Sequence, residues 1–144
     1  MWSDNLLIAE RAHLLRIIAW GAGSILVGTV LLAVLRLRRT RSSLLFHFAV
    51  QTIAWGAVDL VLAWIGWQNL EMRDIAGATR LDRFIWFNAG LDLGYAGVGA
   101  TMIILGWRLG RRLGLVGAGV GVVVQGLALA ILDLQLTMIV ARLV

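Results

Sequence analysis

Four long stretches of the sequence are apolar and contain at most one formally charged residue each. They are 17–35, which has none, and 42–70, 84–107 and 113–141, whose single charges are Asp59, Asp92 and Asp133. An α-helix needs about 20 mainly apolar residues to cross the hydrocarbon core of a bilayer. Apolar and polar residues do not alternate as they would in a β-barrel, and a helix satisfies its own backbone in lipid. The sequence therefore predicts four transmembrane helices.

The composition argues against a soluble protein. Hydrophobic residues make up 60% of the 144 residues, against roughly 45–50% in a soluble domain, which could not bury so much apolar surface. The formal net charge of +5 arises from thirteen arginines. These flank the apolar stretches, where arginine faces lipid headgroups, and we expect no nucleic-acid partner. The chain has no cysteine, which excludes disulfides and thiolate metal sites.

We expect one all-α transmembrane domain over residues 1–144, an integral membrane four-helix bundle with up-down-up-down order. The predicted helices cover about 14–35, 43–68, 84–107 and 113–140. Short connections of this kind join antiparallel neighbours, and the helices leave no room for a soluble domain.

The arginines also predict the orientation in a membrane. The first loop, 36–41, and the third, 108–112, are strongly basic, whereas the second loop and the N-terminus mix both signs. Short loops rich in arginine stay in the cytoplasm, so we expect an N-out/C-out topology. The N-terminus lacks a basic region and a small-residue cleavage site, and the first helix is therefore expected to be retained, unlike a signal peptide.

Each predicted helix carries one face of polar or small residues at helical spacing. On the second helix, for example, Gln51, Trp55 and Asp59 recur every four residues. In lipid such a face turns towards other helices, because polar groups find no partners in hydrocarbon. The residues expected to form a polar network, or an ion or proton site, are Asp59, Asp92, Asp133, Arg16, Asn88, Gln125, Tyr95, Gln51 and Trp55.

The three aspartates are expected to lie in one layer. Counting about 1.5 Å per residue, Asp59 lies roughly 10 Å and Asp92 roughly 12 Å inside the outer ends of their helices. Asp133 lies at a similar depth, and Arg16 is the expected cationic partner. One arginine leaves two carboxylates uncompensated, each costing about 2.5–3.5 kcal/mol at a helix centre. The cluster either holds a proton or cation, forms a neutral network that sets helix register, or faces an oligomer interface.

Small residues predict where helices approach closely. The expected packing residues are Gly28, Gly90, Gly94, Gly97, Gly117 and Gly121. The segment Ile-Ala-Trp-Gly-Ala occurs twice, at 18–22 and at 53–57. It reflects either chance and shared packing needs or the remnant of a duplicated helix.

No set of residues points to catalysis. His13 and His47 lie towards opposite ends of the predicted bundle, so they cannot share a metal within one chain. Each is expected to face headgroups or to be hydrogen-bonded. The sequence has no glycine-rich phosphate loop and no His pair at ligand spacing. We expect no enzyme, no metal site and no cofactor.

Three segments carry a resemblance to a known family: 46–48 with 51–59; Asn88-Ala89-Gly90-Leu91-Asp92-Leu93-Gly94-Tyr95 with Gly99; and 125–126 with 132–133. Together they resemble a family of small bacterial four-helix membrane proteins of unknown function. The resemblance implies a multi-pass protein of the bacterial cytoplasmic (inner) membrane. It also implies that the position of Asp59 is often asparagine, so a charge there is not essential. It implies no activity.

Three functions remain open. The first is a structural or accessory subunit whose helices pack through glycine faces around the polar network. The second is a small proton- or cation-coupled transporter or channel subunit that uses the aspartates. The third is a binder of a lipid or other hydrophobic ligand, using Trp20, Trp55 and Tyr95. The expected partners are membrane lipids and either a second copy, in a homodimer, or a larger membrane complex.

Overall fold

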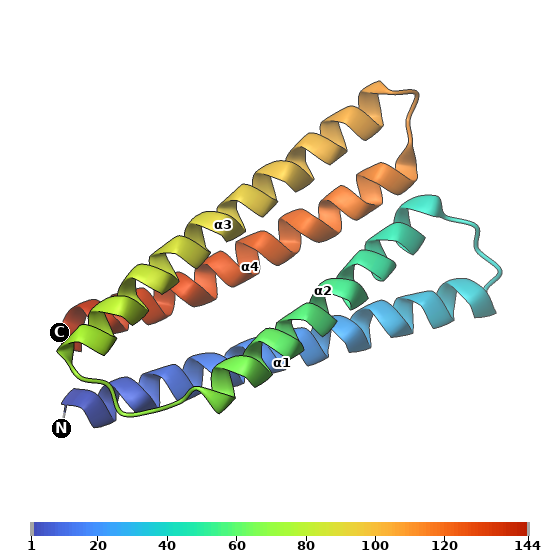
Figure 1. The fold of residues 1–144 in the computed structure, drawn as a ribbon. Helices are drawn as coiled ribbons and strands as arrows, with labels where there is room; N and C mark the ends of the chain where they lie inside the picture. The colour runs from blue at the N-terminus through green and yellow to red at the C-terminus, as the bar shows by residue number, and fades with distance from the viewer. Residues whose placement is uncertain (1, 144) are drawn as a thin grey trace.

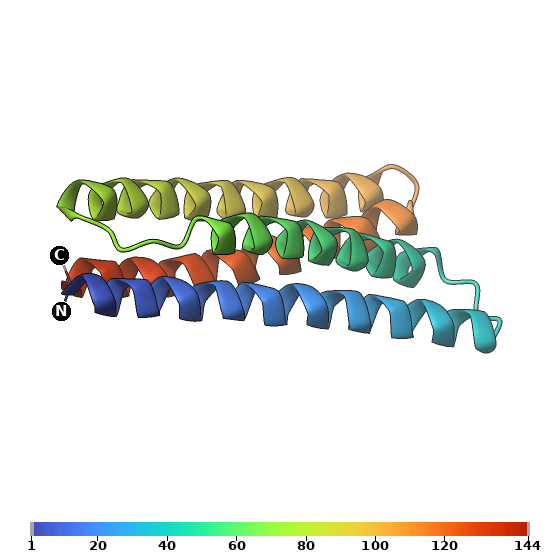
Figure 2. The same cartoon turned by 60° about the horizontal axis from the view of Figure 1, so that its bottom comes forward.

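The computed structural model describes residues 2–143, which form four helices and, within that range, no strand. The helices are α1 (Trp2–Leu37), α2 (Ser43–Gln68), α3 (Ile75–Arg108) and α4 (Leu113–Leu143). Successive helices run in opposite directions, and both ends of the described chain lie at one end of the bundle (Figures 1 and 2). The predicted all-α fold of four helices is confirmed. All four are long and apolar enough to cross a membrane.

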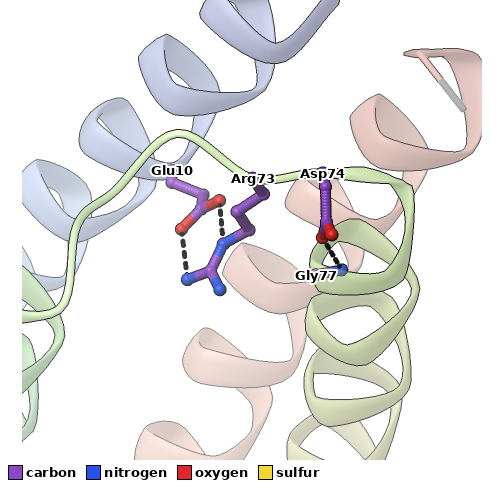
Figure 3. A network of polar contacts seen from close by, with 4 residues as sticks. All are labelled: Glu10, Arg73, Asp74 and Gly77. Carbon is purple, nitrogen blue, oxygen red and sulfur yellow. Dashed lines mark hydrogen bonds and ion pairs between the residues drawn. The ribbon is translucent and has the colours of Figure 1, made fainter.

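Two helices begin earlier than the sequence predicted. α1 starts at Trp2, where we expected a start near residue 14, and α3 starts at Ile75, where we expected residue 84. Charged side chains interrupt an apolar span, but they do not interrupt the backbone hydrogen bonds of a helix. α3 also has its own start signal, since the Asp74 carboxylate accepts a hydrogen bond from the Gly77 N–H at 2.7 Å (Figure 3).

α4 is the central helix of the bundle. α1 packs on α2, and α3 packs on α4, as two antiparallel hairpins; α4 also packs against α2 and α1. By contrast, within the described chain no Cα atom of α3 comes within 8 Å of α1 or α2. The bundle is therefore open on the side where α2 and α3 face each other.

Glycine pairs bring the helix backbones of each hairpin into contact. A Cβ atom on Gly56 would lie 2.6 Å from the Gly21 carbonyl oxygen, and one on Gly21 would lie 2.8 Å from that of Gly56. Gly99 and Gly119 make the same reciprocal contact between α3 and α4, at 2.7 and 2.6 Å. Only glycine permits such an approach. Gly21 and Gly56 are the equivalent glycines of the two Ile-Ala-Trp-Gly-Ala segments. The two copies of the segment therefore contact each other where α1 packs on α2.

The predicted packing glycines divide into two groups. Three of them lie against α2 with little or no room for a Cβ: Gly28, Gly117 and Gly121. A Cβ on Gly90, Gly94 or Gly97 would meet no atom within 4 Å, so within the chain these three do not pack helices as we expected. They lie on the side of α3 opposite Asp92, since a step of two residues turns a helix by about 200°. α4 packs on the Asp92 side.

An ion pair anchors the linker 69–74, which joins α2 to α3. Arg73 donates from Nε to Glu10 Oε1 at 2.7 Å and from Nη2 to Oε2 at 3.0 Å, a bidentate contact with α1 (Figure 3). The hydrogen bond with Glu10 raises the pKa of the Arg73 guanidinium above its ordinary value. A buried apolar cluster from α1, α3 and α4 lies at the same end of the bundle; its members are Leu6, Ala9, Ala78, Ile85, Leu136 and Val140.

Replacement of Gly56 by alanine should destabilise the bundle, because the new Cβ would meet the Gly21 carbonyl, which moves only if the helices separate. We expect a loss of about 1–3 kcal/mol in unfolding free energy, measured as a lower thermal midpoint in detergent. Gly23→Ala is the matched control, since no atom lies within 4 Å of a Cβ there; its midpoint should be unchanged or higher. Equal midpoints for the two variants would show that the backbone contact does not hold the hairpin together.

Loss of the Glu10 carboxylate should free the linker. In Glu10→Gln, Arg73 loses a bidentate pair in which each hydrogen bond is worth about 1.5–3 kcal/mol. Limited trypsin digestion, with cleavage after Arg73 followed by mass spectrometry, should become faster. Glu71→Gln makes the same chemical change at an exposed linker position and should have little effect. If both variants are cut after Arg73 at the same rate, the ion pair does not restrain the linker.

Candidate functional site

A cavity of about 530 Å³ occupies the open side of the bundle between α2 and α3. We call it the α2–α3 cleft; α1 and α4 form its floor. Its lining residues on α1 stop at Ile17 and those on α2 begin at Trp55, so it occupies the half of the bundle nearest the chain ends. Most of the lining is apolar. The charged and hydrogen-bonding side chains in it include Glu10, His13, Asp59, Asn69, Arg73, Asn88, Asp92 and Asp133.

The cleft brings the three predicted aspartates together from three helices. Asp59 on α2, Asp92 on α3 and Asp133 on α4 all line it, and each is more than nine-tenths buried. Asp92 lies within electrostatic range of both other carboxylates. Because α4 lies against both α2 and α3, its aspartate is placed between the other two helices.

Asp59 belongs to a hydrogen-bond chain that crosses the bundle. Trp20 Nε1 on α1 donates to Gln125 Oε1 on α4 at 3.0 Å. Gln125 Nε2 in turn donates to Asp59 Oδ2 on α2. Both Gln125 and Asp59 are buried. This chain ties three helices at one level and gives the Asp59 carboxylate a partner within the protein.

Asp133 pairs with a histidine. His13 Nε2 on α1 lies 3.2 Å from Asp133 Oδ1. The expected partner, Arg16, is exposed and donates instead to Gln135 at 3.3 Å. Arg16 follows His13 by three residues, a turn of about 300°, which carries its side chain to the edge of the buried face of α1. Arg16 is therefore not the partner of the aspartates.

Two side chains that line the cleft have a polar group without a hydrogen-bond partner. His13 is 7% exposed, and its Nδ1 atom bonds to no other described residue. Asp92 is also 7% exposed, and no donor among residues 2–143 reaches its carboxylate. Gly126 lets α4 lie directly on the Asp92 backbone, since a Cβ there would strike the Asp92 carbonyl oxygen. Both groups have unused hydrogen-bonding capacity, but His13 Nδ1 is enclosed by protein atoms, whereas the Asp92 carboxyl group lines the cleft.

Trp55 and Tyr95 join α2 to α3 across the inner end of the cleft. Their ring centroids lie 5.2 Å apart at 59°, although the two helix backbones do not touch. Asn88, one turn before Asp92, lines the same wall of α3. Gln51 lies one turn beyond Trp55, away from the cleft, with its side chain against Gly121. It contributes no hydrogen bond to the network that we expected it to join.

Four polar residues of the cleft were absent from the predicted site: Glu10, His13, Asn69 and Arg73. A signal for the first two exists, because Glu10, His13 and Trp20 share one face of a helix. Glu10 and His13, however, precede the first helix as the sequence predicted it, from about residue 14. Arg73 follows no periodicity, and only the path of the linker brings it to α1. Among the described residues, no three His, Asp or Glu side chains are grouped so that they could hold a metal ion.

A comparison with protein families gives a match over residues 16–134, to the family described as a family of unknown function, DUF6992. The matched region contains Asp59, Asp92, Gln125 and Asp133. No curated protein and no solved structure matches the chain. The resemblance to a family of unknown function, predicted from the three sequence segments, is confirmed. Because the match covers most of its length, the chain belongs to DUF6992, a family of unknown function.

Proposed function

We propose that this protein is a multi-pass protein of the bacterial cytoplasmic membrane that binds a small hydrophobic molecule in the α2–α3 cleft. One observation carries the proposal. The cleft has apolar walls, yet the Asp92 carboxyl group, which lines it, has no hydrogen-bond or ion-pair partner in the described chain. A bound molecule would supply the partner that this group lacks.

The surface of the bundle supports a place in the bilayer. Large apolar side chains are exposed on every helix, as with Leu26, Leu62, Phe87 and Ile131, each more than half exposed. The aspartates of the spans are turned inward. Soluble monomers rarely expose apolar surface of this extent, whereas lipid favours apolar side chains outside and polar ones inside.

The arginines support an N-out/C-out orientation. Loops 38–42 and 109–112 lie at the end of the bundle opposite the termini (Figure 1). Seven arginines belong to this end, and no acidic residue occurs within 36–58 or 93–132. Cytoplasmic loops carry such an excess of arginine. In this orientation the cleft lies in the outer half of the membrane.

Packing alone does not account for the cleft. An unpartnered buried polar group costs about 1–3 kcal/mol of stability. A protein that served only as an accessory subunit would gain nothing from keeping such a group. The volume falls within the range of about 300–1,000 Å³ typical of small-molecule sites. Exposed apolar side chains on both walls, such as Leu62 on α2 and Leu91 on α3, give a hydrophobic molecule a lateral route from lipid.

The extent of the cleft favours binding over conduction. It ends at Trp55 and Tyr95, which contact each other near the middle of the bundle. Beyond them the glycine contact between Gly99 and Gly119 holds α3 tightly on α4. A proton- or cation-coupled transporter would need this second half to open as well.

Cysteine labelling should establish the orientation, and the absence of cysteine from the chain makes single substitutions unambiguous. A membrane-impermeant maleimide should label Met72→Cys, in the exposed linker, in intact cells. It should label Thr40→Cys, in an arginine-rich loop, only after the cells are permeabilised. The reverse pattern would place the termini in the cytoplasm, and equal labelling of both sites in intact cells would contradict a membrane-spanning bundle.

Occupancy of the cleft can be tested with N-phenyl-1-naphthylamine, a neutral hydrophobic fluorophore that accepts energy from tryptophan. Protein in lipid nanodiscs should show saturable energy transfer above the lipid background. Val58→Phe narrows the cleft. It should weaken the affinity for the probe at least tenfold, which corresponds to about 1.4 kcal/mol.

Val61→Phe is the matched control. Val61 lies on the same helix, is exposed and does not line the cleft, so the probe should bind this variant as it binds the unsubstituted protein. Transfer that never saturates, or that falls equally in both variants, would contradict ligand binding in the cleft.

A further inference from the structure

The charges of the cleft are unequally compensated. Glu10 is neutralised by the bidentate contact with Arg73, and Asp133 lies beside His13. Asp59 accepts a hydrogen bond from Gln125. Asp92 alone among the four carboxylates has neither a cation nor a donor within the described chain. Any molecule that enters the cleft therefore meets, at Asp92, a carboxyl group that the described residues leave without a cation or a donor.

His13 also has an unpartnered atom, but this atom does not open onto the cleft. A carboxylate only accepts hydrogen bonds, so the ring nitrogen that faces Asp133, Nε2, is the one that carries a hydrogen. In the neutral ring Nδ1 is then a bare acceptor, and it is buried without a donor. Nδ1 is enclosed by protein atoms, whereas the Asp92 carboxyl group lines the cleft, so it is Asp92 that calls for a ligand with N–H or O–H groups.

We propose that the ligand of the α2–α3 cleft is a hydrophobic organic amine in its ammonium form, bound with its cationic nitrogen at Asp92. This inference rests on the proposed function and names its ligand class. The ammonium supplies both missing properties, positive charge and several N–H donors. The apolar walls take the hydrocarbon part. An anion would be repelled by the carboxylates, and a neutral molecule would leave Asp92 uncompensated.

The aromatic pair at the inner end of the cleft strengthens the choice of a cation. Trp55 and Tyr95 line the cavity, and Tyr95 follows Asp92 by three residues on the same face of α3. A cation over an aromatic face gains more when water is excluded, and tryptophan is the best partner. Asn88 lines the other side of Asp92 and offers an amide oxygen to a second N–H.

Three molecules of nearly the same shape test the proposal: 1-adamantanamine, 1-adamantanol and 1-adamantanecarboxylate, which are cationic, neutral and anionic at pH 7. Equilibrium dialysis against protein in nanodiscs, with empty nanodiscs of the same lipid as background, measures each directly. We expect the amine to bind at least tenfold more tightly than the alcohol, and the carboxylate to bind no better than to empty nanodiscs.

Variants of Asp92 separate charge recognition from folding. Asp92→Asn should weaken amine binding at least tenfold, to the level of the alcohol, while alcohol binding stays unchanged and so shows an intact cleft. Asp92→Glu should retain most of the preference for the amine. Asp82→Asn makes the same chemical change on α3 at a position that does not line the cleft, and it should bind all three molecules as the unsubstituted protein does.

The outcomes distinguish the inference from the proposed function. Equal binding of the amine and the alcohol, or a preference that survives in Asp92→Asn, would overturn the inference and leave ligand binding in the cleft standing. Tighter binding of the carboxylate would overturn it in favour of an anionic ligand. If none of the three molecules binds and the naphthylamine probe also fails to saturate, the proposed function itself is wrong.

Discussion

The close approach of α4 to its neighbours is the contact on which the rest of the structure depends. In the membrane that we propose for this bundle, helices gain little from burying apolar side chains against each other, so close backbone packing becomes the main attraction between them. Gly119 meets Gly99 on α3, and Gly117 lies against the Leu44 backbone on α2. A helix that packs tightly on both α2 and α3 also holds them apart, because its own diameter is about 10–12 Å. The cleft is thus a consequence of where the glycines of α4 lie.

Within that opening the polar groups divide into two kinds. Asp59 and Asp133 are each satisfied by a neighbouring helix, through Gln125 and His13, and so help to set the level at which the helices meet. Asp92 lines the same cleft, and no described residue gives it a partner. A buried pair is weak evidence of stability by itself, but an uncompensated carboxylate is expensive to keep. The difference separates the residues that hold the bundle together from the residue available to a ligand.

The linker adds a constraint at the mouth of the cleft. α2 ends at Gln68, and the chain then crosses to the start of α3, held by Arg73 on Glu10 and by the Asp74 cap (Figure 3). Asn69 and Arg73 line the cleft where the linker passes. The charged pair therefore belongs both to the fold and to the border of the site, and its partial burial makes it more than a surface ion pair.

Particular residues show which features of the structure could be predicted from the sequence. The apolar stretches predicted four helices, and their single aspartates predicted a common depth for Asp59, Asp92 and Asp133. Both predictions were possible because the rise per residue and the cost of a charge in lipid are properties of a single helix. The choice of His13 over Arg16 as the partner of Asp133 was not predictable in this way. It depends on the rotation of α1 about its own axis, which neighbouring helices set. The same rotation on α3 turned Gly90, Gly94 and Gly97 outward although their spacing is that of a packing face.

By itself, then, the sequence determined that the chain is helical, how many apolar helices it forms, and which polar residues lie deep within them. Those features follow from composition and periodicity along one helix at a time. The tertiary structure alone decided which deep residues become partners, that α2 and α3 stay apart, and that Asp92 is left facing a cavity. These depend on the contacts between helices far apart in the chain, where a carbonyl oxygen meets a glycine or a ring meets a carboxylate.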